Sequence, residues 1–384
     1  MNVIYVDNAA TTKMRKSAVA AMLPFLEDNY GNPSSLHSVG QAAANALRDS
    51  RKVIAGCIGA RTSEIFFTSG GSESDNQAIL TGAAYGKSNG KLHIISQKTE
   101  HHAVLNTLKT LEQRGFEIEL LDVDGTGNVS PEQVENAIRE DTALVTIMAA
   151  NNEIGTIMPI KEIAAVCREK GVLFHTDAVQ AVGHILVDVS DIDCDMLSLS
   201  AHKFGGAKGV GVLYVRNGIL PSPLIIGGGQ ENGVRAGTEN VAGVVAMATA
   251  LKEATTDMAR DTLRITKMRD MLIKGLSRTP YLTLNGSMTN RLPGNVNISF
   301  EGIEGESLLL MLDNKGICAS AGSACNSGSL EPSHVLTATG VNPDIARGSI
   351  RFSLSAENTF EEVEYIIQTV IDCVKYLRSV SPIY

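Results

Sequence analysis

The sequence predicts an α/β protein whose larger part is a mostly parallel, seven-stranded sheet wrapped by helices. Between residues 15 and 250, short apolar runs alternate with longer amphipathic stretches, which is the pattern of parallel strands connected by helices. The 36 glycines outnumber the 11 prolines, as expected where many strands end in tight turns. The seven strand candidates read EIFFT, LHIIS, EIELLDV, ALVTIM, VLFHTD, MLSLS and VGVLYV.

The rest of the 384-residue chain predicts a second, smaller domain of α+β type. We expect the large domain to cover residues 15–255 and the small domain to combine residues 1–14 with residues 256–384. A helix-like segment over about 241–277 connects the two. The expected elements of the small domain are strands at LTLNG, GNVNISF and GSIRFSLS and helices near 306–315 and 360–378.

The charge of the chain limits its partners. The formal net charge is −9, and no basic run with interleaved aromatic residues occurs, so we expect no binding to nucleic acid or to anionic membranes. The first residues, MNVIYVDNAATT, contain neither a basic nor an apolar leader region. The longest uncharged apolar stretch, residues 241–251, is too short to span a bilayer. We therefore expect a cytoplasmic protein without a membrane segment.

One of the six cysteines has unusual neighbours. The cysteines, at positions 57, 167, 194, 318, 325 and 373, form no CxxC pair and no cluster with histidine, so we expect reduced thiols and no resident metal. Cys325 lies in ICASAGSACNSGSLEP, a run of small residues that packs poorly, whereas buried cysteines usually lie among large apolar residues. We expect a thiol carried on a mobile loop over about 319–330.

Polar residues follow the predicted strands at the sheet edge where α/β proteins bind ligands. Lys203 comes directly after MLSLS, in SAHKFGG, and a lysine held in a cleft can condense with an aldehyde such as that of pyridoxal 5'-phosphate. Asp177 ends VLFHTD, where a buried carboxylate can keep a pyridine nitrogen protonated. Taken alone, a lysine such as Lys203 is in most cases a surface residue, and Asp177 is a credible helix N-cap. Their spacing of 26 residues favours a shared site.

Two further strand ends carry candidate ligands. FFTSGGSESDNQAI reads as a strand, a glycine-rich turn and a helix, so backbone N–H groups converge on an anion at residues 70–73, although such turns also occur simply as caps. The motif is neither GxGxxG nor the Walker lysine motif. In TEHHAV, His101 can stack on an aromatic cofactor and transfer protons. We expect only one of the two adjacent histidines to face the cleft, and we favour His101.

These motifs together resemble a known family. The chain is similar to cysteine desulfurases of the nitrogen-fixation and iron–sulfur-assembly type, in the class V group of fold-type-I pyridoxal-phosphate enzymes. The resemblance extends from residue 5 to about 355 and keeps the order of the family. Its matching stretches are YVDNAATT, GNPSSLH, TSGGSESDN, EHHAV, NNEIG, DAVQ, SAHK, GGGQENGVRAGT, GSACNSGSLEPSHVL and RFSLS.

The resemblance implies a role for each site residue. Lys203 holds the coenzyme as an imine and carries the Cα proton, Asp177 pairs with the pyridine nitrogen, and His101 stacks on the ring. Gln180 bonds the ring hydroxyl, and Asn152 lies beside coenzyme and substrate. The phosphate is expected to meet Gly71, Ser72, Ser200 and His202, with Thr238 reaching in from the neighbouring subunit of a homodimer.

The resemblance also assigns the substrate and the sulfur acceptor. Arg351 would bind the carboxylate of L-cysteine through its forked guanidinium, whereas without the family match it is equally an exposed strand arginine. Cys325 would attack the substrate sulfur as a thiolate and carry it away as a persulfide, leaving L-alanine. The sulfur would go to an acceptor protein for iron–sulfur cluster assembly or for tRNA or cofactor thiolation, and Cys325 would contact a cluster on that partner only transiently.

Some residues depart from the family pattern. Ala207 stands where the family commonly has proline, and Asn326 replaces a common threonine after the nucleophile. The chain ends at LRSVSPIY, without the extension that housekeeping relatives use to dock the cluster scaffold. The identity of the sulfur acceptor is therefore left open. One alternative is a selenocysteine lyase or another class V lyase or aminotransferase, with Cys325 incidental. Another is a non-catalytic sulfur-relay or scaffold protein, which the retention of Lys203 and Asp177 disfavours.

Overall fold

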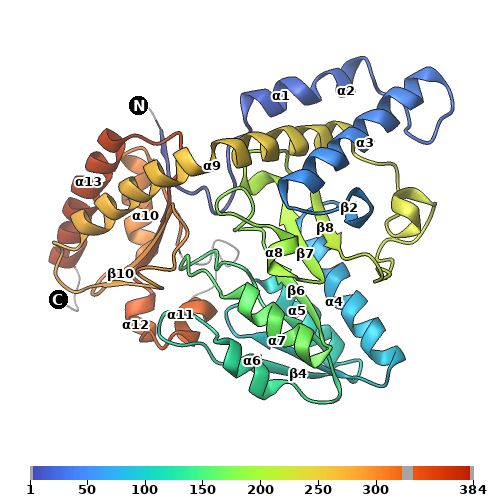
Figure 1. Cartoon of the computed structure of the whole chain (residues 1–384). Coiled ribbons are helices and arrows are strands. Elements are labelled where there is room, and N and C mark those ends of the chain that lie inside the picture. Colours follow the sequence, from blue (N-terminus) through green and yellow to red (C-terminus); the bar gives the residue numbers. More distant parts are fainter. Residues whose placement is uncertain (1–2, 322–331, 381–384) are drawn as a thin grey trace.

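The computed structural model describes residues 3–321 and 332–380 and has two parts joined by one long helix. Figure 1 shows the larger part as a sheet with helices on both sides and the smaller part beside it, with helix α9 (Val241–Leu276) extending along both. None of the helices in these residues is both long and apolar enough to cross a membrane. Cys325 lies outside the described residues.

All seven predicted strands of the larger part join one sheet. Their order is β2-β8-β7-β6-β5-β3-β4, and each pair from β7 to β4 is parallel, whereas β8 runs antiparallel to both of its neighbours. The prediction of a mostly parallel, seven-stranded sheet is therefore confirmed. The strands are β2 (Ile65–Thr68), β3 (His93–Gln97), β4 (Glu117–Leu121), β5 (Thr142–Thr146), β6 (Leu173–Asp177), β7 (Met196–Ser200) and β8 (Gly211–Val215).

Helices cover both faces of the sheet because successive strand residues point to opposite sides. In β7, Leu197 and Leu199 belong to the larger hydrophobic cluster, which includes side chains of α3, α7 and α9, whereas Met196 belongs to the cluster under α4 and α5. The helices of this part are α1 (Lys16–Met22), α2 (Pro24–Glu27), α3 (Ser38–Cys57), α4 (Gly71–Ser88), α5 (His102–Glu112), α6 (Pro131–Ala137), α7 (Ile160–Lys170) and α8 (Val189–Ile192), with 3-10 turns η1 (Thr62–Glu64), η2 (Ala201–Lys203) and η3 (Gln230–Gly233).

The smaller part contains an antiparallel sheet in the order β12-β10-β9 and a short parallel pair, β1 with β11. Its hydrophobic cluster draws only on Val6 and on residues from 265 to 374, which supports the predicted domain division, and that division stays a prediction. Its elements are β1 (Ile4–Tyr5), β9 (Leu282–Leu284), β10 (Asn295–Phe300), α10 (Gly305–Asn314), β11 (Ile317–Cys318), α11 (His334–Ala338), α12 (Pro343–Ala346), β12 (Ser349–Ser353) and α13 (Phe360–Val380).

Two glycines let the turn after β2 approach the sheet closely. Gly70 has φ of 150°, a conformation that side chains rarely adopt. A Cβ atom on Gly211, at the start of β8, would lie 2.7 Å from the Cα atom of Gly70. The close contact fixes where α4 begins.

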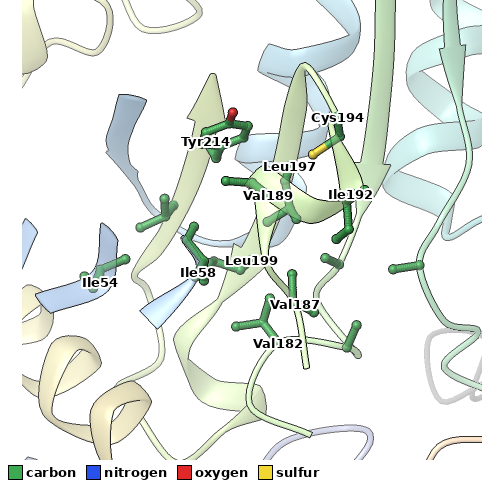
Figure 2. Close-up of a cluster of buried hydrophobic side chains, with 14 of the residues drawn as sticks. Ile54, Ile58, Val182, Val187, Val189, Ile192, Cys194, Leu197, Leu199 and Tyr214 are labelled. Atoms are coloured by element: carbon green, nitrogen blue, oxygen red, sulfur yellow. The ribbon is translucent and has the colours of Figure 1, made fainter. Parts of the chain in front are cut away.

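Figure 2 shows the part of the core where α3, β7, β8 and the segment around α8 meet. All the labelled side chains are buried, so shape complementarity across four elements determines the packing. The labelled residues are Ile54, Ile58, Val182, Val187, Val189, Ile192, Cys194, Leu197, Leu199 and Tyr214.

Leu197→Ala tests this packing. Leu197 has no exposed surface, and truncating a buried leucine leaves a cavity, so we expect the free energy of unfolding to fall by about 2–5 kcal/mol. Leu186→Ala is the matched control because Leu186 is 84% exposed, and its loss should stay within about 0.5 kcal/mol. Chemical denaturation of both variants measures the difference, and equal losses would contradict the packing.

Candidate active site

A cavity of about 440 Å³ opens at the carboxyl ends of the parallel strands, the edge where α/β sheets bind ligands. Arg351, from β12, reaches it from the smaller part of the chain. The cavity is lined by Ala9, Ala10, Gly71, Ser72, Asp75, Glu100, His101, His102, Met148, Asn152, Glu153, Asp177, Val179, Gln180, Ser200, His202, Lys203, His334 and Arg351.

The structure brings together most of the site residues proposed from the sequence, although their roles stay predictions. Thr238 is exposed and does not line the cavity of this subunit, and its predicted place is the site of a neighbouring subunit. Cys325 lies outside the described residues. The residues found in the cavity are Gly71, Ser72, His101, Asn152, Asp177, Gln180, Ser200, His202, Lys203 and Arg351.

Lys203 ends a 3-10 turn that directly follows β7. Its Nζ atom donates hydrogen bonds to the carbonyl oxygens of Ala9 (2.7 Å) and Ala10 (2.9 Å). The side-chain amide of Gln180 donates to the same Ala9 carbonyl at 2.9 Å. The amine is therefore held inside the cavity by backbone carbonyls, on a turn that the end of β7 fixes in place.

Asp177 is the last residue of β6 and is 5% exposed. Its Oδ1 atom accepts the N–H of Val179 at 2.9 Å, the kind of bond that an N-cap makes, but no helix begins here among the described residues. Burial raises the pKa of Asp177, and interactions with His101 and Lys203 oppose this rise. The carboxyl group thus lies in the cavity near two basic groups.

His101 caps α5, because its Nδ1 atom accepts the N–H of Ala103 at 3.1 Å. Burial lowers the pKa of His101, and Lys203 and His102 lower it further against the opposing charge of Asp177. At neutral pH the ring is therefore uncharged, with its proton on Nε2.

The expectation that only one histidine faces the cleft is wrong. His101 and His102 both line the cavity, with ring centroids 6.4 Å apart and planes inclined at 54°. Both reach it because the chain turns from an extended residue at His101 into the helix at His102. The ring of His102 lies 4.7 Å from that of His334, a third lining histidine that the sequence analysis missed.

The start of α4 lies at the cavity and has the geometry that suits an anion. Backbone N–H groups at the first residues of this 18-residue helix point outward along its axis, where the helix dipole favours negative charge. A Cβ atom on Gly71 would lie 2.6 Å from the side chain of Val179, so the turn leaves room only for glycine there. Burial, with the charges of Lys203 and Lys208, lowers the pKa of His202 to about 4.

Arg351 is 1% exposed, which excludes the alternative of an exposed strand arginine. Its Nη2 atom donates to the carboxylate of Asp7 at 2.9 Å and its Nη1 atom to the carbonyl of Asn152 at 3.0 Å. Its Nε atom is buried and has no acceptor among the described residues. The guanidinium is therefore fixed at the cavity wall while its Nε donor is unused.

Comparisons with known proteins agree with this geometry. Residues 4–366 match the family described as Aminotransferase class-V. The chain is 52% identical to cysteine desulfurase IscS of Methanosarcina thermophila, over 99% of this chain and 94% of that protein. It is 50% identical to cysteine desulfurase IscS of Dictyoglomus turgidum, over 99% of this chain and 96% of that protein. The chain belongs to the cysteine desulfurases of this family.

Solved structures of the family have the same fold. A NifS-like protein superposes with a TM-score of 0.92 at 38% identity, covering 98% of this chain and all of the other. A structure described as SspA in complex with cysteine has a TM-score of 0.81 at 39% identity and covers 93% of this chain and all of the other. The prediction of the fold-type-I architecture of this desulfurase family is confirmed.

The sequence analysis missed three buried acids in the cavity of this desulfurase: Asp75, Glu100 and Glu153. A signal was present for two of them. Asp75 follows Ser72 by one helical turn and so shares its helix face, and Glu100 directly precedes His101. Glu153 is 3% exposed, its Oε2 atom accepts the hydroxyl of Ser333 at 2.5 Å, and burial raises its pKa to about 7.

Glu153→Gln tests this buried acid. The pKa of Glu153 in the folded protein lies above the ordinary value of 4.5, so the folded chain keeps a proton that the unfolded chain loses. The free energy of unfolding of the wild type should therefore fall as pH rises from about 4.5 to 7. The variant should lack the contribution of Glu153 to this decrease. Thermal unfolding across that range measures it. Glu140→Gln, at an exposed residue, should keep the wild-type profile.

Proposed function

We propose that this desulfurase converts L-cysteine to L-alanine with pyridoxal 5'-phosphate and transfers the sulfur to Cys325 as a persulfide. One observation carries the proposal: Lys203, Asp177 and Arg351 meet in a single cavity of about 440 Å³. An amine, a carboxyl group and a fixed guanidinium are the groups that an aldehyde coenzyme and an amino-acid substrate require. The relative solved with cysteine in complex supports this substrate class.

The residues of the cavity fit the coenzyme. The N-terminus of α4 with Gly71, Ser72, Ser200 and His202 suits the phosphate, and Asp177 suits the pyridine nitrogen. The neutral ring of His101 is suited to stack on an aromatic ring, and Gln180 to bond its hydroxyl group. When bound, the coenzyme supplies an aldehyde that condenses with amines and a ring that accepts electrons from Cα.

Lys203 and Arg351 would act on the substrate from opposite ends. The guanidinium of Arg351 binds the α-carboxylate, and its bonds to Asp7 and to Asn152 keep it from rotating away. The amine of Lys203, released from the Ala9 and Ala10 carbonyls, moves the proton at Cα. Orientation and proton transfer are thus divided between two side chains from different parts of the chain.

The sulfur step balances without an added oxidant. The Cys325 thiolate attacks the substrate sulfur, an S–S bond forms, and the substrate C–S bond breaks. The electron pair of the broken C–S bond stays on the Cβ side, and the Cβ atom takes up one proton and becomes the methyl group of alanine, while the transferred sulfur remains on Cys325 as a persulfide. We propose a homodimer in which Thr238 completes the partner's phosphate site, and a protein acceptor that uses the sulfur for iron–sulfur assembly or thiolation.

Cys325→Ala should stop the formation of alanine from L-cysteine, because no nucleophile remains for the sulfur. Mass spectrometry of the wild type after incubation with L-cysteine should show one added sulfur atom on the peptide that contains residue 325. The matched control is Cys318→Ala, which removes a different thiol, one that is half-buried, and should keep activity. Unchanged turnover in Cys325→Ala would favour the selenocysteine lyase or another lyase or aminotransferase. Sulfur transfer surviving Lys203→Ala would favour the non-catalytic relay.

Arg351→Lys should raise KM for L-cysteine roughly 10- to 100-fold, with a smaller effect on kcat. The lysine cannot make the forked pair with the carboxylate, and hydrogen bonds to a charged group are worth about 1.5–3 kcal/mol. Steady-state kinetics of alanine formation measures both constants. Arg264→Lys, whose guanidinium bonds the carbonyls of Ala356 and Asn358 outside the cavity, is the control. A loss confined to kcat would overturn the carboxylate assignment.

A further inference from the structure

Three buried acids meet at one end of the cavity. Asp75 is 1% exposed, Glu100 has no exposed surface and Asp177 is 5% exposed. A carboxyl oxygen of Asp75, one of Asp177 and a ring nitrogen of His101 all lie within 4.8 Å of one another. Glu100 interacts electrostatically with both Asp75 and Asp177. The three buried carboxylates therefore repel one another, and they cannot all be ionised.

The surroundings of Asp177 favour its ionised form. The positive charge of Lys203 stabilises this form, and the N–H of Val179 donates to it. Neither Asp75 nor Glu100 forms an ion pair with lysine or arginine among the described residues. Among the three acids, a negative charge is therefore best placed on Asp177.

The nearest basic group to Asp75 is a histidine that carries no charge. The Nε2 atom of His175 lies 3.8 Å from Oδ1 of Asp75. Both ring nitrogens of His175 are engaged, Nδ1 with Thr146 at 2.8 Å and Nε2 with Ser198 at 3.0 Å, and burial lowers the pKa of His175 to about 3. The Oδ1 atom of Asp75 is buried and has no hydrogen-bond partner among the described residues. A hydrogen bond from the Ser198 side chain favours the ionised form of Asp75, but an ionised Asp75 would still be a buried charge without a lysine or arginine beside it among the described residues.

Glu100 has one satisfied oxygen and one orphan oxygen. Its Oε1 atom accepts the N–H of Met148 at 2.6 Å and the amide of Gln97 at 2.9 Å. Its Oε2 atom is buried without a hydrogen-bond partner among the described residues, which suits the O–H of a protonated acid better than half of a carboxylate. Burial and the charge of Asp177 raise the pKa of Glu100 to about 8, and burial, Asp177 and Glu100 raise the pKa of Asp75.

We propose that this end of the cavity carries one negative charge, on Asp177, and that Asp75 and Glu100 each hold a proton and act as positioning residues. Because both are neutral, Asp177 is the one anion among the three acids that pairs with the protonated ring nitrogen. A second anion would compete with Asp177 for the same cation. The pairing of Asp177 with the ring nitrogen rests on the proposed function. The assignment of protons to Asp75 and Glu100 does not depend on the coenzyme.

Infrared spectroscopy of the full chain without coenzyme tests the assignment, because a protonated carboxyl group has its own C=O stretching band. At about pH 7.5, Asp75→Asn and Glu100→Gln should each remove one such band, and Asp177→Asn should remove none. On titration, the band lost in Glu100→Gln should disappear in the wild type with a midpoint of about 8. A band missing in Asp177→Asn, or none missing in the other two, would overturn the proposal.

Two controls calibrate the bands. Glu153→Gln should remove a band whose wild-type midpoint is about 7. Glu231→Gln should remove none, because Glu231 is a buried carboxylate paired with Arg51 at 2.6 Å. Both amide variants of the proposal keep the size of the side chain, and circular dichroism checks that they fold.

The visible absorption of the coenzyme-loaded protein supplies a second measurement. In Asp75→Asn the pH midpoint of this absorption should stay unchanged, because one neutral group replaces another. Loss of a real neighbouring charge would shift the midpoint by about one unit or more and would overturn the proposal. If the protein never takes up the coenzyme, the proposed function fails, while the infrared result on the coenzyme-free chain still decides the proton assignment.

Discussion

The parallel register of β6 with β7 is the constraint on which the site depends. It places Asp177 opposite Ser198, so that β7 continues past the end of β6 and the 3-10 turn with Lys203 follows within reach of the Asp177 carboxyl group. Because side chains alternate along a strand, a slip by one residue would turn Asp177 away from the cavity and into an apolar cluster. The core beneath these two strands therefore does more than stabilise the fold, since it fixes the distance between the amine and the acid.

The segment that follows β1 connects the two parts of the protein through the site. Asn8 bonds the carbonyl of Ser353 in β12, and Asp7 holds the guanidinium of Arg351. Directly after them, Ala9 accepts bonds from both Lys203 and Gln180. The group suited to the substrate carboxylate and the group suited to the coenzyme are thus positioned against one short stretch of backbone. A small shift of the smaller part would therefore move Arg351 relative to Lys203.

The sequence predicts those features that have local signals. Each strand of the large sheet is a short apolar run, and the polar residues at its end mark the ligand edge, so Lys203, Asp177 and His101 could be found without coordinates. The direction of β8 and the two-residue pairing of β1 with β11 depend on contacts between distant segments and have no such signal. The buried acids were not predicted from the sequence for a different reason. In a sequence, Asp75 at an early turn of α4 looks like a residue that stabilises the helix dipole in solvent.

Burying these acids makes physical sense only if the cavity serves a ligand. Burying a carboxyl group without a cation costs folding free energy in either protonation state. As an anion the group loses its hydration, and as a neutral acid it must keep a proton at a pH where the unfolded chain releases it. Packing alone would favour apolar residues of the same size at the positions of Asp75 and Glu100. A positively charged ring nitrogen beside Asp177 would give this buried carboxylate a second cation besides Lys203. Binding of that cation should therefore stabilise the folded chain more than its contact area alone would suggest, because it also pairs the buried charge of Asp177.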